Sequence, residues 1–309
     1  MPYQIKFLDA HRHPDIWDAL VLSDDPHYSS ALYRAFGGGI LGFLEADDRP
    51  QIMQPFMRQG DNWIGNAYNF GGPIGALDQF GAEFAFTLDA WKQAEGVKER
   101  CTLNPFLDQN VQVMGRMPKT TEIVYVDLRG EIQTRATTRH CIKKACDAGV
   151  KVERVEPTIA NTSIFSDIYH EAMTFKQAAP HWFYRDSFFY DVLTFLGQDK
   201  AALFLTKVGD QIESGCLLIM SPEICYYHWA ATRGNHPKLG VNHCQVWDTI
   251  NWARYLGFKK FHLGGGFDSL MTFKQGFSKL TLPCRSYVTH PEQVKECHDR
   301  DSGRGRIKP

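Results

Sequence analysis

The 309-residue sequence predicts a mixed α/β (α+β) fold with two similar domains, each a mostly antiparallel sheet flanked by helices. Three observations support this. Strand-like apolar runs occur in groups joined by short turns. Each group precedes a helical stretch and one more strand. The same order occurs in both halves of the chain, without a residue-level repeat. A hydrophobic fraction of 43% is ample for a buried core.

The first half begins the pattern with a hairpin. Its two apolar stretches are separated by Asp47, Asp48 and Pro50, which favour a turn. A glycine-rich segment then precedes a long helical stretch. The expected elements are a helix over residues 29–35, a glycine break at 37–39, strands over 40–45 and 52–57, a glycine-rich segment at 68–73, a helix over 80–94 and a strand over 101–103.

The second half repeats this order with different residues. Gly209 and Asp210 favour a turn between two strands. Val246, Ile250 and Ala253 recur at helical spacing, and Gly257 is typical of a helix end. The expected elements are strands over 201–208, 212–220 and 224–232, a helix over 242–255, a strand over 258–263 and a glycine turn at 264–266.

Two helices and an aromatic block are expected between these units. The helix over 133–148 carries Arg135, Arg139 and Lys143 at i, i+4 and i+8, so the three basic groups share one face. This basic stripe could bind the phosphates of a nucleotide, a lipid pyrophosphate or RNA, or it could be a solvated face balanced by nearby acidic residues. A second helix covers 163–174. The block 181–195 is dense enough in aromatic residues to form core or to line a cleft.

Charge and composition exclude several functional classes. With 34 Lys+Arg and 35 Asp+Glu the net charge is −1, so the basic footprint of a nucleic-acid-coating protein is missing and no DNA partner is expected. No apolar run approaches the ~20 residues of a membrane-spanning helix. The N-terminus lacks the features of a signal peptide, which predicts a cytoplasmic protein. The tail over 299–309 is expected to be disordered.

Metal sites and nucleophile triads are not expected either. The eight cysteines are scattered without a CxxC pair, which predicts reduced, mostly buried thiols. No HExxH, histidine ligand cluster or GxSxG elbow occurs.

The segment around Lys274 is the most informative for chemistry. Its lysine lies between Phe273 and Phe277, two rings that could anchor the backbone while the ammonium reaches a cleft. There the ammonium could stabilise negative charge that develops on a carbonyl oxygen. The alternative is a lysine at a helix end whose charged group extends past core aromatics to solvent.

Several segments, taken in order, resemble the C-terminal half of FemABX-type transferases. They are Tyr227-His-Trp-Ala-Ala-Thr232, Trp252-Ala-Arg-Tyr-Leu-Gly257, Phe261-His-Leu-Gly-Gly-Gly266 and Phe273-Lys-Gln-Gly-Phe277. Arg139 to Val150 is similar to the family's basic helix with its Gly-Val strand, and Phe70-Gly-Gly-Pro73 to its glycine-proline loop. This family includes peptidoglycan-bridge aminoacyltransferases and a BioF-like acetyltransferase group, and it is related to the GNAT acyltransferases.

The resemblance implies two GNAT-like domains and transfer of an acyl or aminoacyl group to an amine. The first domain would comprise residues 1–132 and 285–309, with a returning strand over 284–289, and the second residues 133–284. Lys274 would be the family lysine that assists at the donor's ester carbonyl. Substrate-binding residues are expected at Phe273, Arg135, Arg139, Lys143, Gly71, Gly72, Tyr227 and His228.

Two departures from the family affect the chemistry. Asn104 stands where bridge enzymes often carry an acidic residue, so it cannot be a general base. Proton removal is therefore expected to be assisted by the substrate or by water, without a covalent enzyme intermediate. The coenzyme A pyrophosphate loop of GNAT enzymes is represented by residues 237–242, where only the middle glycine, Gly240, is retained.

The leading hypothesis is a transferase that moves an aminoacyl group from aminoacyl-tRNA to an amine of a cell-wall (peptidoglycan) precursor or related metabolite. The co-substrate would be charged tRNA, the acceptor a small-molecule amine, free or linked to a nucleotide or lipid, and no cofactor or metal would be bound. One alternative is an N-acyltransferase that uses acetyl-CoA or another acyl-CoA on an amino sugar or small amine. The other is a binding module without catalysis.

Overall fold

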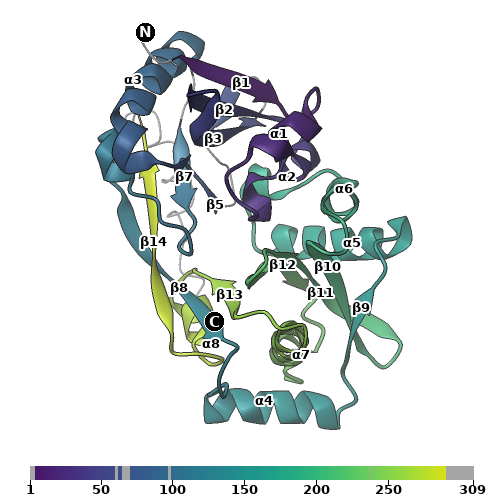
Figure 1. The fold of residues 1–309 in the computed structure, drawn as a ribbon. Coiled ribbons are helices and arrows are strands. Elements are labelled where there is room, and N and C mark those ends of the chain that lie inside the picture. Colours follow the sequence, from purple (N-terminus) through teal and green to yellow (C-terminus); the bar gives the residue numbers. More distant parts are fainter. Residues whose placement is uncertain (1–3, 60–61, 65–69, 97–98, 237, 290–309) are drawn as a thin grey trace.

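The computed structural model describes residues 4–59, 62–64, 70–96, 99–236 and 238–289. Its strands form two sheets (Figure 1). The first contains β1 (Ile5–Asp9), β2 (Gly39–Ala46), β3 (Arg49–Gln59), β4 (Asn62–Ile64) and β6 (Ile74–Gly75). The second contains, in spatial order, β5 (Phe70–Gly71), β7 (Arg100–Leu103), β14 (Thr281–Val288), β8 (Lys119–Asp127), β13 (Lys260–Gly264), β12 (Ile224–Thr232), β11 (Gln211–Met220), β10 (Ala201–Val208) and β9 (Lys151–Val155).

Helices cover these sheets. They are α1 (Pro14–Leu20), α2 (Ser30–Ala35), α3 (Leu77–Glu95), α4 (Ala136–Asp147), α5 (Ile159–Phe175), α6 (Phe188–Leu196), α7 (Val241–Tyr255) and α8 (Asp268–Lys274). Short 3₁₀ turns are η1 (Pro26–Tyr28), η2 (Val111–Met114) and η3 (Pro180–Trp182). Among the described residues, no helix is long and apolar enough to cross a membrane.

The predicted mixed fold with mostly antiparallel pairing is confirmed. The expected hairpin is β2 with β3, and the expected meander is β10, β11 and β12. In the described part of the chain only β5–β7 and β12–β13 pair in parallel. Strands β8 and β14 connect the two halves of the second sheet. The exact domain boundaries at 132/133 and 284/285 stay a prediction, and the tail over 299–309 lies outside the described residues.

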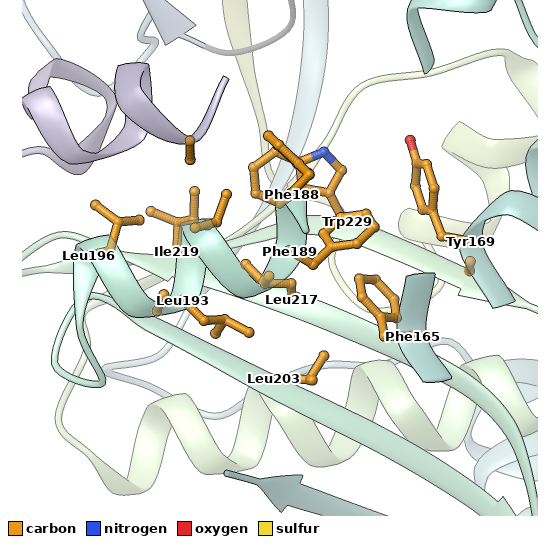
Figure 2. Packing of buried hydrophobic residues seen from close by; sticks show 14 of the residues in the cluster. Phe165, Tyr169, Phe188, Phe189, Leu193, Leu196, Leu203, Leu217, Ile219 and Trp229 are labelled. Atoms are coloured by element: carbon orange, nitrogen blue, oxygen red, sulfur yellow. The ribbon is translucent and has the colours of Figure 1, made fainter. Parts of the chain in front are cut away.

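The core explains why the meander strands are apolar on both faces. Leu203, Leu217 and Ile219 face α5 and α6, while the alternate residues Phe204 and Leu218 face α7. Figure 2 shows the first of these clusters, in which the α6 rings lie beside Trp229. Phe188 and Phe189 are at most 1% exposed, so part of the aromatic block forms core, as one of the two alternatives predicted.

The cysteines follow the expectation of free, mostly buried thiols. Those that the structure describes are unpaired, and Cys101, Cys216, Cys225, Cys244 and Cys284 are buried. Cys141 is half-buried and Cys146 is exposed, whereas Cys297 lies outside the described residues.

Candidate functional site

The site begins where the two parallel strands of the second half separate. Pairing of β12 with β13 ends at Tyr226 and His262, and a cavity of about 350 Å³ is lined by the residues that follow on both strands. A bulge in β12 leaves His228 without a partner on β11, which brings consecutive side chains to the cavity. The lining also includes His27, Phe70, Arg100, Thr102, His181, Trp182, Tyr226, Tyr227, Trp229, Leu263, Gly264, Gly265 and Lys274.

Lys274 provides a buried cationic group in the wall of this cavity. It ends α8, and its neighbour Phe273 packs against His243 and Phe277 at ring distances of 4.9 and 5.4 Å. Phe277 is fully buried. These rings anchor the segment, so the lysine side chain turns to the cavity wall and is only 9% exposed. The ammonium therefore reaches the cleft instead of extending to open solvent.

The glycine turn after β13 accommodates the ammonium. Lys274 Nζ donates a hydrogen bond to the carbonyl oxygen of Gly265. Gly264 has φ +80°, and a Cβ at this position would lie 3.2 Å from Nζ. Burial lowers the pKa of the Lys274 ammonium to about 8. At neutral pH the group is still mainly charged, in a site where charge interacts more strongly than in water.

Histidines dominate the rest of the wall. Burial lowers the pKa of His228, and burial together with the nearby Lys274 charge lowers the pKa of His262 to about 3. Both rings are therefore neutral at physiological pH. Nε2 of His262 is buried and has no hydrogen-bond partner among the described residues, so it is available to a ligand or a water molecule in the cavity. Within the described ranges, no three His, Cys, Asp or Glu side chains are grouped as metal ligands.

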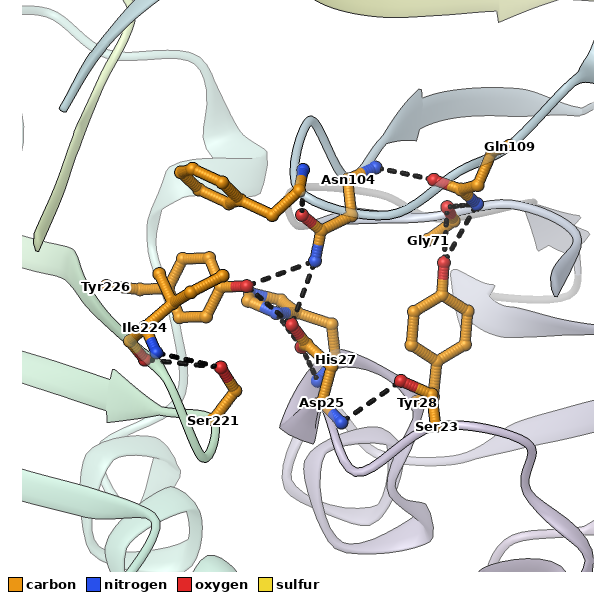
Figure 3. A network of polar contacts seen from close by, with 11 residues as sticks. Ser23, Asp25, His27, Tyr28, Gly71, Asn104, Gln109, Ser221, Ile224 and Tyr226 are labelled. Atoms are coloured by element: carbon orange, nitrogen blue, oxygen red, sulfur yellow. Dashed lines mark hydrogen bonds and ion pairs between the residues drawn. The ribbon is translucent and has the colours of Figure 1, made fainter. Parts of the chain in front are cut away.

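A buried polar network joins this wall to the η1 turn in the first half of the chain (Figure 3). Asp25 is 5% exposed and accepts a hydrogen bond from Asn104 Nδ2 at 2.9 Å and another from the Tyr226 hydroxyl. Its other oxygen lies 2.6 Å from Nδ1 of His27. Burial opposes ionisation of Asp25, but the charge of His27 and these hydrogen bonds outweigh it and lower the pKa of the carboxyl group. Asn104 thus acts as a donor to a carboxylate.

The glycine-proline loop, residues 70–73, packs beside this network. The carbonyl oxygen of Gly71 accepts hydrogen bonds from Tyr28 at 2.8 Å and from Gln109 at 2.9 Å. Gly72 has φ +87°, and a Cβ there would lie 2.6 Å from Leu103. Of this loop it is Phe70 that lines the cavity, whereas the two glycines are buried in the packing around it.

The basic stripe lies elsewhere. Arg135 has an extended backbone and is the N-cap of α4, so the predicted helix start at 133 is wrong by three residues. Its N–H donates to the carbonyl oxygen of Gly276 at 2.7 Å. Arg135 and Arg139 line a second cavity, of about 920 Å³, which Lys274 does not line. Lys143 is exposed and pairs with Asp147 at 2.7 Å. Binding of substrate by this stripe stays a prediction.

The structure therefore brings Lys274, Tyr227 and His228 together, and adds residues that sequence reasoning missed. The Tyr227 hydroxyl accepts a hydrogen bond from Gln245 at 2.7 Å. Asp25 and His27 were missed because Asn104 and Tyr226, which donate to Asp25, lie 79 and 201 positions away from it along the chain. The spacing Asp25-Pro-His27 was the one local signal, since it allows a carboxylate to reach the imidazole of the same turn.

Comparisons with known proteins identify the fold. Residues 133–275 match the family model described as the Acetyltransferase (GNAT) domain. No curated protein matches the sequence of this chain. FemX is similar in structure, with a TM-score of 0.57, 14% identity and coverage of 83% of this chain and 89% of FemX. L-PGS from Bacillus licheniformis gives a TM-score of 0.60 at 16% identity, covering 89% of this chain and 92% of that one.

A tandem GNAT protein from the clavulanic acid biosynthesis pathway is also similar, with a TM-score of 0.52, 10% identity and coverage of 92% of this chain and 97% of that protein. At such identities these structures establish the fold. Together with the family model, they confirm the resemblance to FemABX-type and GNAT-related proteins and the two GNAT-like domains.

Proposed function

Because residues 133–275 match a GNAT acetyltransferase domain and the fold is similar to that of FemX, we propose that this chain transfers an aminoacyl group, carried by aminoacyl-tRNA, to an amine of a cell-wall precursor or related metabolite. The observation that carries the proposal is the buried ammonium of Lys274 in the wall of the cavity beyond β12 and β13. The acceptor is a small-molecule amine, free or linked to a nucleotide or lipid.

A cation at this place would favour amide formation. A neutral amine attacks the activated carbonyl carbon, and the carbonyl oxygen becomes an oxyanion in the tetrahedral intermediate. A preorganised positive group beside that oxygen stabilises the transition state more than the ground state. Lys274 Nζ, held by Gly265 and partly shielded from water, is suited to this role.

The start of α7 favours an aminoacyl donor over coenzyme A. Gly240 has φ +75°, and a Cβ there would lie 2.6 Å from the carbonyl oxygen of Cys141 on α4. Close packing of α4 therefore accounts for the one glycine that this chain shares with the pyrophosphate loop of coenzyme-A-using enzymes. A pyrophosphate would need the free N–H groups of this helix end, where a carbonyl oxygen of α4 approaches closely.

The second candidate is an acyl-CoA-dependent N-acyltransferase acting on an amino sugar or small amine. It is favoured by the description of the matching family model as an acetyltransferase domain.

A thermal-shift titration with coenzyme A separates the two donors. A ligand at 100 times its Kd stabilises the folded state by about 2.7 kcal/mol. We expect no saturable rise in Tm, because α4 packs at the α7 N-terminus. A saturable rise would instead support the acyl-CoA candidate.

Product analysis tests the activity itself. The purified protein is incubated with charged tRNA or with acetyl-CoA, and with glucosamine, lysine or ethanolamine as the amine, and products are identified by mass spectrometry. We expect an aminoacyl amide from charged tRNA. Binding of an amine without product from any donor would contradict the proposal and support a module without catalysis.

A further inference from the structure

A second titratable group faces the cavity beside Lys274. His27 lies in η1, in the first half of the chain, and its side chain is 1% exposed. Its ring lies 4.7 Å from the Tyr226 ring and 5.2 Å from the Phe70 ring. The same two rings lie 5.5 and 5.1 Å from His262, whose pKa is affected by the Lys274 charge. His27 and Lys274 therefore belong to one small site.

The orientation of the His27 ring is fixed on one side only. Nδ1 is held 2.6 Å from Asp25, and the backbone N–H of His27 donates to the same carboxylate oxygen at 3.0 Å. Nε2 has no hydrogen-bond partner among the residues that the structure describes, while the residue lines the cavity. Because Nδ1 faces the Asp25 carboxylate, Nε2 is the ring nitrogen that is placed to accept a proton from a ligand in the cavity.

A purely structural role for Asp25 and His27 does not explain why a histidine ring lies at the cavity. The second oxygen of Asp25 is already satisfied by Tyr226 and Asn104, so the network could join the two halves without a titratable ring at the cavity. His262 and His228 are poor candidates for a base, since burial lowers the pKa of His262 to about 3 and also lowers that of His228. His27 alone of these three has an anionic partner in hydrogen-bond contact.

We infer that His27 is the proton acceptor for the attacking amine, and that Asp25 is a positioning residue that stabilises the resulting imidazolium. This inference rests on the proposed acyl transfer and adds the base to it. The amine nitrogen forms a bond to the acyl carbon, and its proton moves to Nε2 of His27. The bond between the acyl carbon and the donor oxygen then breaks, and the imidazolium returns the proton to that oxygen, so an amide and a free hydroxyl result.

The network also explains Asn104. An acidic residue at this position would place a second carboxylate beside Asp25, and two such groups cannot both ionise without a large pKa shift. The amide instead donates to Asp25 and to the Tyr226 hydroxyl, at 2.9 and 3.1 Å. The carboxylate of this site therefore comes from the η1 loop.

His27→Gln is the direct test, with the donor and amine that give product in the panel. We expect kcat to fall about 10²- to 10⁴-fold, the usual contribution of a general base. His140→Gln, on the exposed face of α4, is the matched control and should keep wild-type activity. In His27→Ala, added imidazole should restore part of the rate. Folded His27 variants with wild-type kcat would overturn the inference.

Asp25→Asn tests the positioning role of the carboxylate. We expect kcat to fall while KM stays near its wild-type value, because the imidazolium formed in the transition state loses its anionic partner. Asp25→Glu should recover part of the lost kcat. A folded Asp25→Asn protein with wild-type kcat would contradict the positioning role.

The two proposals fail in different ways. If the wild-type protein acylates none of the amines with any donor, the proposed function is wrong. If the wild-type protein is active and the His27 variants are equally active, the transferase stands and only the assignment of the base is wrong.

Discussion

Lys274→Met lowers kcat/KM by about 10²- to 10³-fold, which is the usual loss when one oxyanion donor is removed. Methionine has a similar length and no charge, so the side chain can keep its packing beside Gly264 and lose only the interaction with the developing oxyanion. The change is measured with the donor and amine identified by product analysis. Circular dichroism and the Tm should match those of the wild-type protein.

The control is Lys200→Met. Lys200 is exposed and lines neither cavity, so its loss should leave the rate unchanged. The wild-type enzyme should also lose rate as the pH rises through about 8, because burial lowers the pKa of Lys274 to about 8 and the ammonium becomes a neutral amine above it. A Lys274→Met enzyme with wild-type activity would exclude the oxyanion role.

Lys92→Met should lower the free energy of unfolding by about 3–5 kcal/mol, the usual cost of removing one member of a buried ion pair. Glu99 is fully buried, and its carboxylate lies 2.5 Å from Lys92 Nζ. Gln54 and Tyr287 donate to the same carboxylate at 2.6 and 2.7 Å, so the network joins α3 to β3 and β14. Urea denaturation followed by tryptophan fluorescence measures the change.

Two further variants make this prediction specific. Lys143→Met removes an exposed lysine from a surface pair with Asp147 and should leave the urea midpoint unchanged. The double variant Lys92→Met/Glu99→Gln should recover part of the lost stability, because no unpaired charge then remains buried. A single variant as stable as the wild-type protein would contradict the role given to the pair.

The same network has a defined pH dependence. Burial opposes ionisation of Glu99, but Lys92, Arg116 and the hydrogen bonds lower its pKa below the ordinary value of 4.5. The stabilisation is therefore present above about pH 4.5 and is lost as the pH falls through the lower value in the folded protein.

The regular elements could be predicted where apolar residues follow a clear period. The hairpin of β2 and β3 and the helix α7 agree with expectation within two or three residues. Strand β8 was missed because its first half, Lys119–Glu122, is polar and exposed, and only the residues from Ile123 are buried. Its partners β13 and β14 are far away in sequence, so tertiary pairing decides its structure.

A site residue could be predicted only where the residues that fix its position lie next to it in the sequence. Lys274 was found because the flanking phenylalanines anchor the helix end that carries it. The basic face of α4 was equally visible, yet it lies at a different cavity, because periodicity shows which residues share a face and not what that face meets. Asp25 and His27 reach β12 across the fold, a contact that a local pattern does not contain.

A crystal structure with an unreactive donor analogue, in which the transferable ester is replaced by an amide, tests the central claim most directly. We expect the analogue's carbonyl oxygen to lie in the cavity beyond β12 and β13, within hydrogen-bond distance of Lys274 Nζ. A donor whose carbonyl group is bound beside Arg135 and Arg139, with Nζ still on the Gly265 oxygen, would contradict it.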